Sequence, residues 1–149
     1  MPTHYSGSAR EKRALDVFIK LLRAGNSVSS EANRHLDEHG LSPSQFAVLE
    51  ALHHVGPMCL SDLSQKILRT AGNLTMIVDN LEKRGLAKRM TGSKDRRFVR
   101  VEITPKGSDL IRRVFPAHAA RIADLMSRLT PGEQEQLASL CRKLGAISE

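Results

Sequence analysis

The chain has 149 residues, of which 23 are Lys or Arg and 16 are Asp or Glu, so its formal net charge is +7. This length suits a single domain with an ordinary hydrophobic core, and the positive excess favours a polyanionic partner. One Tyr, four Phe and no Trp are too few aromatic rings for stacking on single-stranded bases to explain the charge.

Three further features of the sequence narrow the class of protein. No apolar run approaches the about 18 residues that a membrane-spanning helix needs. Residues 1–13 lack the apolar stretch of a signal peptide, and two distant cysteines give no disulfide framework. We therefore expect a cytoplasmic protein.

The first predicted helix covers about residues 9–39 and is ended by Gly40. Gly25 and the serines around it weaken the middle of this segment, so a break there stays open. An apolar stripe at helical spacing marks one face of its first half: Leu15, Phe18, Ile19 and Leu22.

The second predicted helix, residues 43–55, has a strong start signal. Ser42-Pro43-Ser44-Gln45 places a hydroxyl at the N-cap, Pro at the first helical position and Gln at the third, which is a capping box. Gly56-Pro57 ends this helix, residues 58–60 are expected to be extended, and a third helix is predicted from about Ser61.

The fourth predicted helix covers residues 71–84, has small side chains at its N-terminal end and is ended by Gly85. One face is apolar at spacings i, i+3, i+4 and i+7: Leu74, Ile77, Val78 and Leu81. The N-terminal end carries small or polar residues: Thr70, Gly72, Asn73 and Thr75. A helix that enters the major groove by its N-terminus needs slim side chains there, some of them able to bond base edges.

A basic β-hairpin is predicted after this helix, with strands at 86–90 and 98–103 and a polar turn at 91–97. Between residues 60 and 106, eleven Lys and Arg stand against five Asp and Glu, so this segment carries +6 of the net +7. The concentration favours a nucleic acid partner, and a merely solvated surface is the alternative.

Two more helices are predicted at the C-terminal end, residues 105–129 and 131–146. Thr130-Pro131-Gly132-Glu133 is a second capping box, and Thr104-Pro105 supplies the cap and Pro alone. The last helix carries an apolar stripe: Leu137, Leu140, Cys141 and Leu144.

The expected fold is mainly α with a small β-hairpin (α+β), in one domain over residues 1–149. Residues 41–104 form a winged helix-turn-helix lobe, and residues 9–40 and 105–149 form a helical dimerisation region. Both chain ends carry apolar stripes, which are buried most simply against each other and a second copy by two-fold symmetry. A monomer with a helical cap is the alternative.

Five motifs in this order resemble the MarR family of bacterial transcription regulators over nearly the whole chain. They are 41–49 (LSPSQFAVL), 60–63 (LSDL), 80–86 (NLEKRGL), 95–97 (DRR) and 103–107 (ITPKG). The resemblance implies an obligate homodimer, a pseudo-palindromic operator, and repression released by a small ligand or by oxidation. Residues 72–75 look like the branch that senses quinones, phenols and related aromatics.

The resemblance assigns the recognition helix to residues 71–84 and the wing to residues 91–98. We expect Thr70, Asn73 and Thr75 nearest the bases, with Asn73 as a local helix cap in the alternative. Gly72 is expected to let the backbone approach a phosphate closely, with simple helix-start geometry as the alternative. Met76 stands where many members have Arg or another polar residue, which puts a base contact there in doubt.

Arg97 is the expected minor-groove probe, because a narrow groove over A·T steps attracts a guanidinium, and Asp95 is expected to orient it. An exposed turn with charges for solubility is the alternative. Contacts that position the protein on phosphates without reading sequence are expected from five further residues: Lys66, Lys88, Arg89, Lys94 and Arg96.

The family's effector pocket lies between the dimer helices and the DNA-binding lobe. Six residues are candidates for its lining, with simple core packing as the alternative: Phe18, Leu22, His35, Phe46, Leu49 and His53. The first helix lacks the Cys that peroxide sensors of the family use there. A zinc site would need several dispersed ligands to converge: His35, His39, His53, His54 and Cys59. We expect no metal and no cofactor.

The sequence therefore predicts a sequence-specific regulator that binds double-stranded DNA, most simply a homodimeric repressor released by a small aromatic or phenolic ligand. No Gly-rich phosphate loop, nucleophile elbow or paired-His metal motif appears, so we do not expect an enzyme. A winged helix used for protein contact or duplex RNA, without operator specificity, stays open, as does the choice between repressor and activator.

Overall fold

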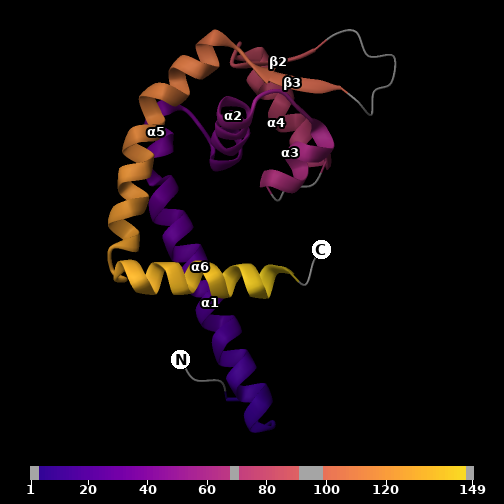
Figure 1. The fold of residues 1–149 in the computed structure, drawn as a ribbon. Helices are drawn as coiled ribbons and strands as arrows, with labels where there is room; N and C mark the ends of the chain where they lie inside the picture. Colours follow the sequence, from indigo (N-terminus) through magenta and orange to yellow (C-terminus); the bar gives the residue numbers. More distant parts are fainter. Residues whose placement is uncertain (1–3, 68–70, 91–98, 147–149) are drawn as a thin grey trace. The chain divides into compact units, whose positions relative to one another are not determined.

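The computed structural model describes residues 4–67, 71–90 and 99–146, and its chain is divided between two compact units (Figure 1). One unit is formed by residues 1–34 and 120–149, and the other by residues 35–119. The second unit is larger than the lobe predicted at 41–104, because it includes the segment before α2 and the first part of α5.

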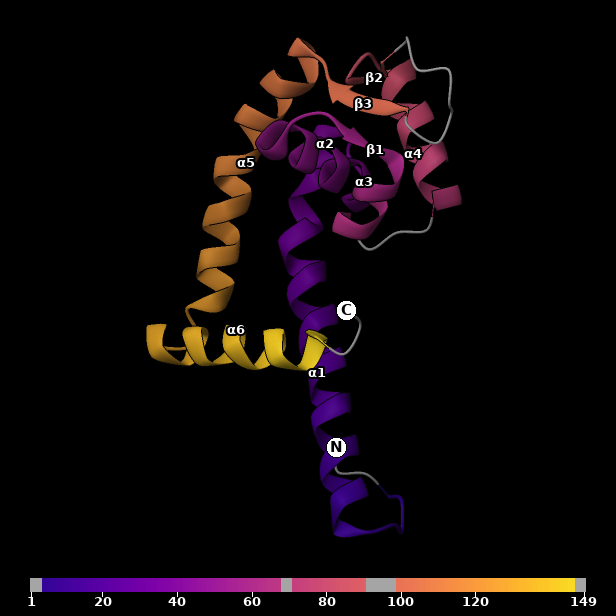
Figure 2. The same ribbon diagram turned by 45° about the vertical axis from the view of Figure 1, so that its right-hand side comes forward.

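Three complete α-helices and a small sheet lie in the unit of residues 35–119, together with most of η1 and the first part of α5 (Figure 2). In chain order these are α2 (Pro43–Val55), β1 (Met58–Cys59), α3 (Leu60–Ile67), α4 (Ala71–Lys83), β2 (Ala87–Arg89) and β3 (Arg100–Ile103). They are preceded by the 3-10 helix η1 (Arg34–His39) and followed by the start of α5 (Pro105–Met126).

The sheet has three antiparallel strands in the order β1-β3-β2. Ala87 pairs with Ile103, as the predicted hairpin requires, and Cys59 of β1 pairs with Arg100 on the other side of β3. The third strand ties the start of α3 to the wing strands, so the helix-turn-helix and the hairpin share one framework.

A single hydrophobic core holds this unit together. Leu49 of α2, Leu63 of α3, Val101 of β3 and Ile111 of α5 are all fully buried in it. From α4 the core takes the predicted apolar stripe: Leu74, Val78 and Leu81 are fully buried, and Ile77 packs against the core from a partly buried position.

The first helix ends earlier than predicted. The α-helix α1 (Ala9–Asn33) continues through Gly25 without a break, and the chain then tightens into η1. Gly40 adopts a φ of 67°, and the Leu41 amide donates to the carbonyl of Leu36 at 3.1 Å. The predicted helix to residue 39 is therefore wrong in its last six residues, because a 3-10 turn and a left-handed glycine close the segment.

The other unit contains α1, the end of α5 and α6 (Pro131–Gly145). Ser8 and Glu11 form a capping box at the start of α1, and Thr130 and Glu133 form the predicted one at the start of α6. Hydrogen bonds from the Ser8 backbone and hydroxyl stabilise the carboxylate of Glu11 and lower its pKa below the ordinary value.

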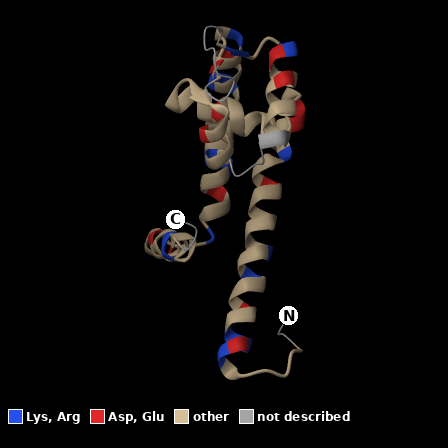
Figure 3. Ribbon diagram, turned by 90° about the vertical axis from the view of Figure 1, so that its right-hand side faces the viewer, with Lys and Arg blue, Asp and Glu red and all other residues tan. Residues whose placement is uncertain are grey.

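Several large apolar side chains of this unit are exposed in the single chain. They lie on α1 and α6: Val17, Phe18, Leu21, Leu22, Leu137, Leu140 and Leu144. Figure 3 shows Lys, Arg, Asp and Glu together in the first turns of α1 and only separate charged positions farther along it. Within the described residues, no helix combines the length and apolarity needed to cross a membrane.

Candidate nucleic-acid interface

The recognition helix predicted by the sequence is α4, and it has two distinct faces. Leu74, Val78 and Leu81 fix one face in the core, and none of them is exposed. Asn73 and Thr75 are exposed near the N-terminal end of the helix, and Met76 is 73% exposed beside them. The first two turns of α4 therefore present an amide, a hydroxyl and a thioether side chain outward on a rigidly packed support.

Polar contacts to α2 and to the turn before it fix the C-terminal half of α4 and the residue that follows it. The Gln45 amide nitrogen donates to Asn80 Oδ1 at 2.9 Å, and Arg84 donates to the Gly40 carbonyl at 2.7 Å. Gln45 also caps its own helix by accepting from the Ser42 amide at 3.0 Å. One side chain of the capping box thus also sets the position of the recognition helix, a non-local role that the local motif does not reveal.

Two cationic side chains of β2 differ in what they contact. Lys88 is exposed and lies 3.0 Å from a carboxylate oxygen of Glu102 on the neighbouring strand. Arg89 is only 28% exposed and contacts two carboxylates of α4, Asp79 at 2.7 Å and Glu82. Both residues are predicted phosphate contacts, and in the structure Arg89 forms a brace between β2 and α4.

The charge of Arg89 is held firmly by this brace. Partial burial disfavours its charged form, but the hydrogen bonds and negative charges of Glu82 and Asp79 outweigh that effect and raise the pKa of the guanidinium above its ordinary value. Arg89 therefore stays charged and offsets one of the two negative charges that Asp79 and Glu82 place on the helix expected to meet DNA.

Of the other predicted DNA contacts, Lys66 is exposed at the end of α3, and Gly72 lies in the first turn of α4. Five predicted contacts lie outside the described residues: Thr70, Lys94, Asp95, Arg96 and Arg97. The described part of the predicted interface is thus the outward face of α4 together with Lys66 and Lys88.

The predicted effector-pocket residues are divided between the two compact units. Phe18 and Leu22 are exposed on α1, whereas Phe46, Leu49 and His53 belong to α2. Phe46 and Leu49 are buried in the hydrophobic core, in keeping with the alternative that they are packing residues.

His35, the sixth candidate, lies among other rings of the second unit. Its ring is 5.2 Å from that of His118, which in turn is 4.6 Å from Phe46. Among the residues that the structure describes, His, Cys, Asp and Glu side chains nowhere form a group of three that could hold a metal ion. The convergence that a zinc site requires is not found there.

The comparisons with known proteins agree on one family. The model of the MarR family matches residues 41–99. The Bacillus subtilis HTH-type transcriptional regulators YkoM and MhqR are each 39% identical to the chain, covering 93% and 90% of it and 90% and 92% of their own lengths.

A solved structure gives the same answer for the fold. Bordetella bronchiseptica BpsR, whose DNA binding is regulated by 6-hydroxynicotinic acid, matches with a TM-score of 0.79 and 27% identity. The match covers 87% of this chain and 98% of that one. With its exposed α4 face, its three-stranded wing sheet and relatives at 39% identity over nine-tenths of its length, the chain belongs to the MarR family of transcription regulators.

Proposed function

We propose that the chain is a homodimeric regulator of transcription that binds duplex DNA in the cytoplasm and catalyses no reaction. The observation that carries the proposal is the outward face of α4, where Asn73, Thr75 and Met76 are exposed while the opposite face is fully buried. A helix packed in this way can enter the major groove by its N-terminal end without losing its support.

The side chains on this face define what the helix can read. An Asn can bond the N6 and N7 edge of adenine bidentately, and a Thr offers a hydroxyl or a methyl group. Met76 offers only apolar contact, so it favours the methyl group of thymine over guanine. In the wing we assign the minor-groove contact to Arg97, with Asp95 as its orienting partner, as the sequence predicts.

The dimer follows from the apolar side chains that the single chain leaves exposed on α1 and α6. Phe18 and Leu140 are each more than half exposed, and isolated proteins rarely leave so many large apolar groups in water. A two-fold dimer would present its two α4 helices to half-sites about one helical turn apart, roughly 34–36 Å. The preferred duplex is therefore an inverted repeat.

Regulation by a small ligand is the second part of the proposal. The likeness to BpsR, a relative whose DNA binding responds to an aromatic acid, supports it. A ligand changes DNA affinity only if it binds one arrangement of the two reading helices better than another. We therefore assign the chain as a repressor that an aromatic or phenolic ligand releases from its operator.

Selection of duplexes from a random DNA pool tests the DNA-binding part. We expect an inverted repeat to be enriched, and the Asn73→Ala variant to bind it more weakly by about 5- to 150-fold for each half-site, since one bidentate base contact contributes about 1–3 kcal/mol. Asn26→Ala, which changes an exposed Asn on α1, is the matched control. Equal binding by the two variants, or competition by duplex RNA of the same sequence, would contradict the assignment.

A further inference from the structure

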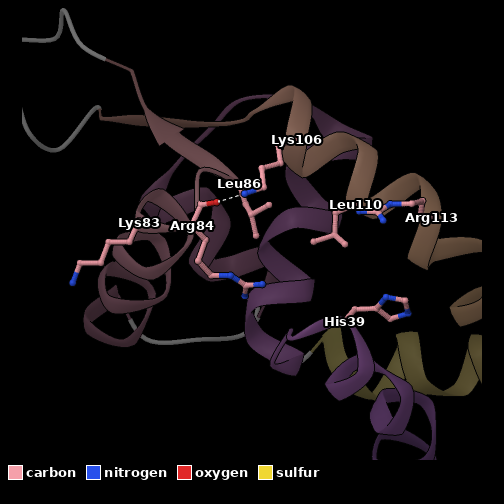
Figure 4. Close-up of a pocket in the computed structure, with 7 residues that line it drawn as sticks. All are labelled: His39, Lys83, Arg84, Leu86, Lys106, Leu110 and Arg113. Carbon is pink, nitrogen blue, oxygen red and sulfur yellow. Dashed lines mark hydrogen bonds between the residues drawn. The ribbon is translucent and has the colours of Figure 1, made fainter.

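A cavity of about 420 Å³ lies at the C-terminal end of α4, within the unit of residues 35–119 (Figure 4). Its lining combines basic and apolar side chains: His39, Lys83, Arg84, Leu86, Lys106, Leu110 and Arg113. No Asp or Glu is among these described lining residues. The DNA-reading face of α4 is at the other end of the helix, so this cavity belongs to none of the contacts assigned above.

Three of the four Lys and Arg side chains lie around the cavity and one turns away. In Figure 4 the ammonium group of Lys83 points away from the others, whereas the ends of Arg84, Lys106 and Arg113 lie around Leu86 and Leu110. Within the described residues, none of these three cations forms an ion pair with a carboxylate. Their positive charge is left for another partner.

Two of the three cations are held in place by backbone carbonyls. Arg84 donates to the Gly40 carbonyl at 2.7 Å, and the Lys106 ammonium donates to the Arg84 carbonyl at 3.1 Å. Each keeps further N–H groups free of these bonds, because a guanidinium has five donors and an ammonium three. Lys106 also offsets the partial negative charge at the end of α4.

The base of the cavity is apolar. Leu86 is buried and Leu110 is nearly so, and they lie between the cationic groups. A volume of this size lies within the range of small-molecule sites, and the lining is more basic than is usual for them. Charge-assisted hydrogen bonds from guanidinium and ammonium groups are the strongest way to bind a carboxylate or phosphate.

We propose that this cavity binds a small organic anion, a phosphate monoester or a carboxylate on a compact apolar body. The anionic group is held by Arg84, Lys106 and Arg113, and the apolar body rests on Leu86 and Leu110. DNA phosphate is a poorer occupant, because the 13 residues of α4 place its reading end about 20 Å from the cavity.

The site is placed to control the recognition helix, an extension that rests on the proposed function. Arg84 belongs to the turn that ends α4, and its bond to Gly40 lies beside the Gln45–Asn80 bond that fixes α4 to α2. An anion that competes for the Arg84 guanidinium loosens this attachment. Anion binding and DNA binding then weaken each other by the same factor.

Calorimetric titration of the full chain without DNA tests the site itself. Phenyl phosphate is expected to bind more tightly than inorganic phosphate, which lacks the apolar body, and than benzyl alcohol, which lacks the charge. Arg113→Gln should weaken phenyl phosphate at least tenfold, as the loss of one charge-assisted bond requires. Arg128→Gln is the control, because it removes the same charge from an exposed residue that does not line the cavity.

The Gly40 and Gly85 amides report where the probe binds. They flank the cavity, and their NMR signals should move with phenyl phosphate in the parent protein and in Arg128→Gln. The proposal is overturned if Arg113→Gln and Lys106→Met both bind phenyl phosphate as tightly as the parent protein does. It is also overturned if none of the probes binds. A loss of duplex affinity in Arg113→Gln without loss of phenyl phosphate binding overturns it too, because Arg113 would then contact DNA.

The two proposals fail separately in this design. If phenyl phosphate binds but no duplex does, the proposed function is wrong while the anion site stands. If the selected inverted repeat binds and phenyl phosphate does not, the reverse holds. If both bind and phenyl phosphate leaves duplex affinity unchanged, the coupling through Arg84 is wrong.

Discussion

The dimer is the part of the proposed function whose energetics the structure specifies best, and Leu140→Ala is the sharpest perturbation. Leu140 is 62% exposed on α6, in line with Leu137 and Leu144 on the same helix face. Full burial of a Leu side chain contributes about 1.5–3 kcal/mol. The exposed fraction therefore leaves about 1–2 kcal/mol to be gained in each protomer, and two-fold symmetry doubles this to about 2–4 kcal/mol per dimer.

Sedimentation equilibrium measures the consequence directly. Leu140→Ala should raise the dimer dissociation constant roughly 30- to 1,000-fold, since every 1.4 kcal/mol is a factor of ten. Circular dichroism should show unchanged helix content, because Ala is the better helix former. Val55→Ala is the matched control, because Val55 is 58% exposed but lies at the end of α2 in the other unit. A parent chain that is monomeric at tens of micromolar, or a variant that dimerises as tightly, would refute the reasoning.

Three further outcomes follow from particular contacts. Asn73→Ala should weaken binding to the selected inverted repeat more than binding to unrelated duplex in a gel-shift assay, because base contacts carry the specificity. Gly107→Ala should lower the free energy of unfolding by roughly 1–3 kcal/mol in denaturant titration, because a Cβ there meets the Leu86 carbonyl. The pKa of Glu11 is lowered in the folded chain, so its ionised carboxylate stabilises the start of α1 at pH values above the ordinary pKa of 4.5. This stabilisation is lost as the pH falls through the lowered pKa of the folded state. Glu11→Gln should therefore remove the fall in amide-exchange protection near Ser8 that the parent chain shows as the pH is lowered.

Local signals in the sequence predicted those elements whose ends are set by local chemistry. The capping boxes at Ser42 and Thr130 predicted the first residues of α2 and α6 correctly. Gly85 ends the recognition helix with a φ of 71°, a conformation that glycine adopts readily. The apolar stripe of α4 is buried as its spacing predicts, because period and packing agree there.

Contacts between distant segments could not be read in the same way. The pairing of β1 with β3 joins residues about forty positions apart, and two residues of extended chain carry no register signal. The end of α1 depends on how Leu41 and Gly40 close the 3-10 turn, which helical periodicity does not encode.

The candidate site shows the same division. The outward face of α4 follows from the helical period, so Asn73 and Thr75 could be named from the sequence. The cavity at the other end of α4 could not, since it combines residues from η1, α4 and α5 that only the fold brings together. The seven-residue spacing of Lys106 and Arg113, which puts both on one helix face, was the one available signal.

Arg89 is where the sequence and the structure give different roles to the same side chain, and the two roles have different thermodynamic consequences. A phosphate contact contributes about 0.9 to the slope of log affinity against log salt, and its removal leaves folding stability nearly unchanged. A brace to Asp79 and Glu82 contributes to folding instead, on the order of 1 kcal/mol for such partly exposed pairs.

We therefore expect Arg89→Met to lower the free energy of unfolding by about 1 kcal/mol and to leave the salt slope of duplex binding unchanged. Lys88→Met, which changes the exposed neighbour on the same strand, should do the opposite and reduce that slope by about 1.8, or about 0.9 for each protomer of the dimer. In a background where Asp79 and Glu82 are replaced by their amides, Arg89→Met should cost no further stability, because its partners are already gone. If Arg89→Met instead reduced the salt slope of duplex binding and left the free energy of unfolding unchanged, Arg89 would be a phosphate contact, as the sequence predicts.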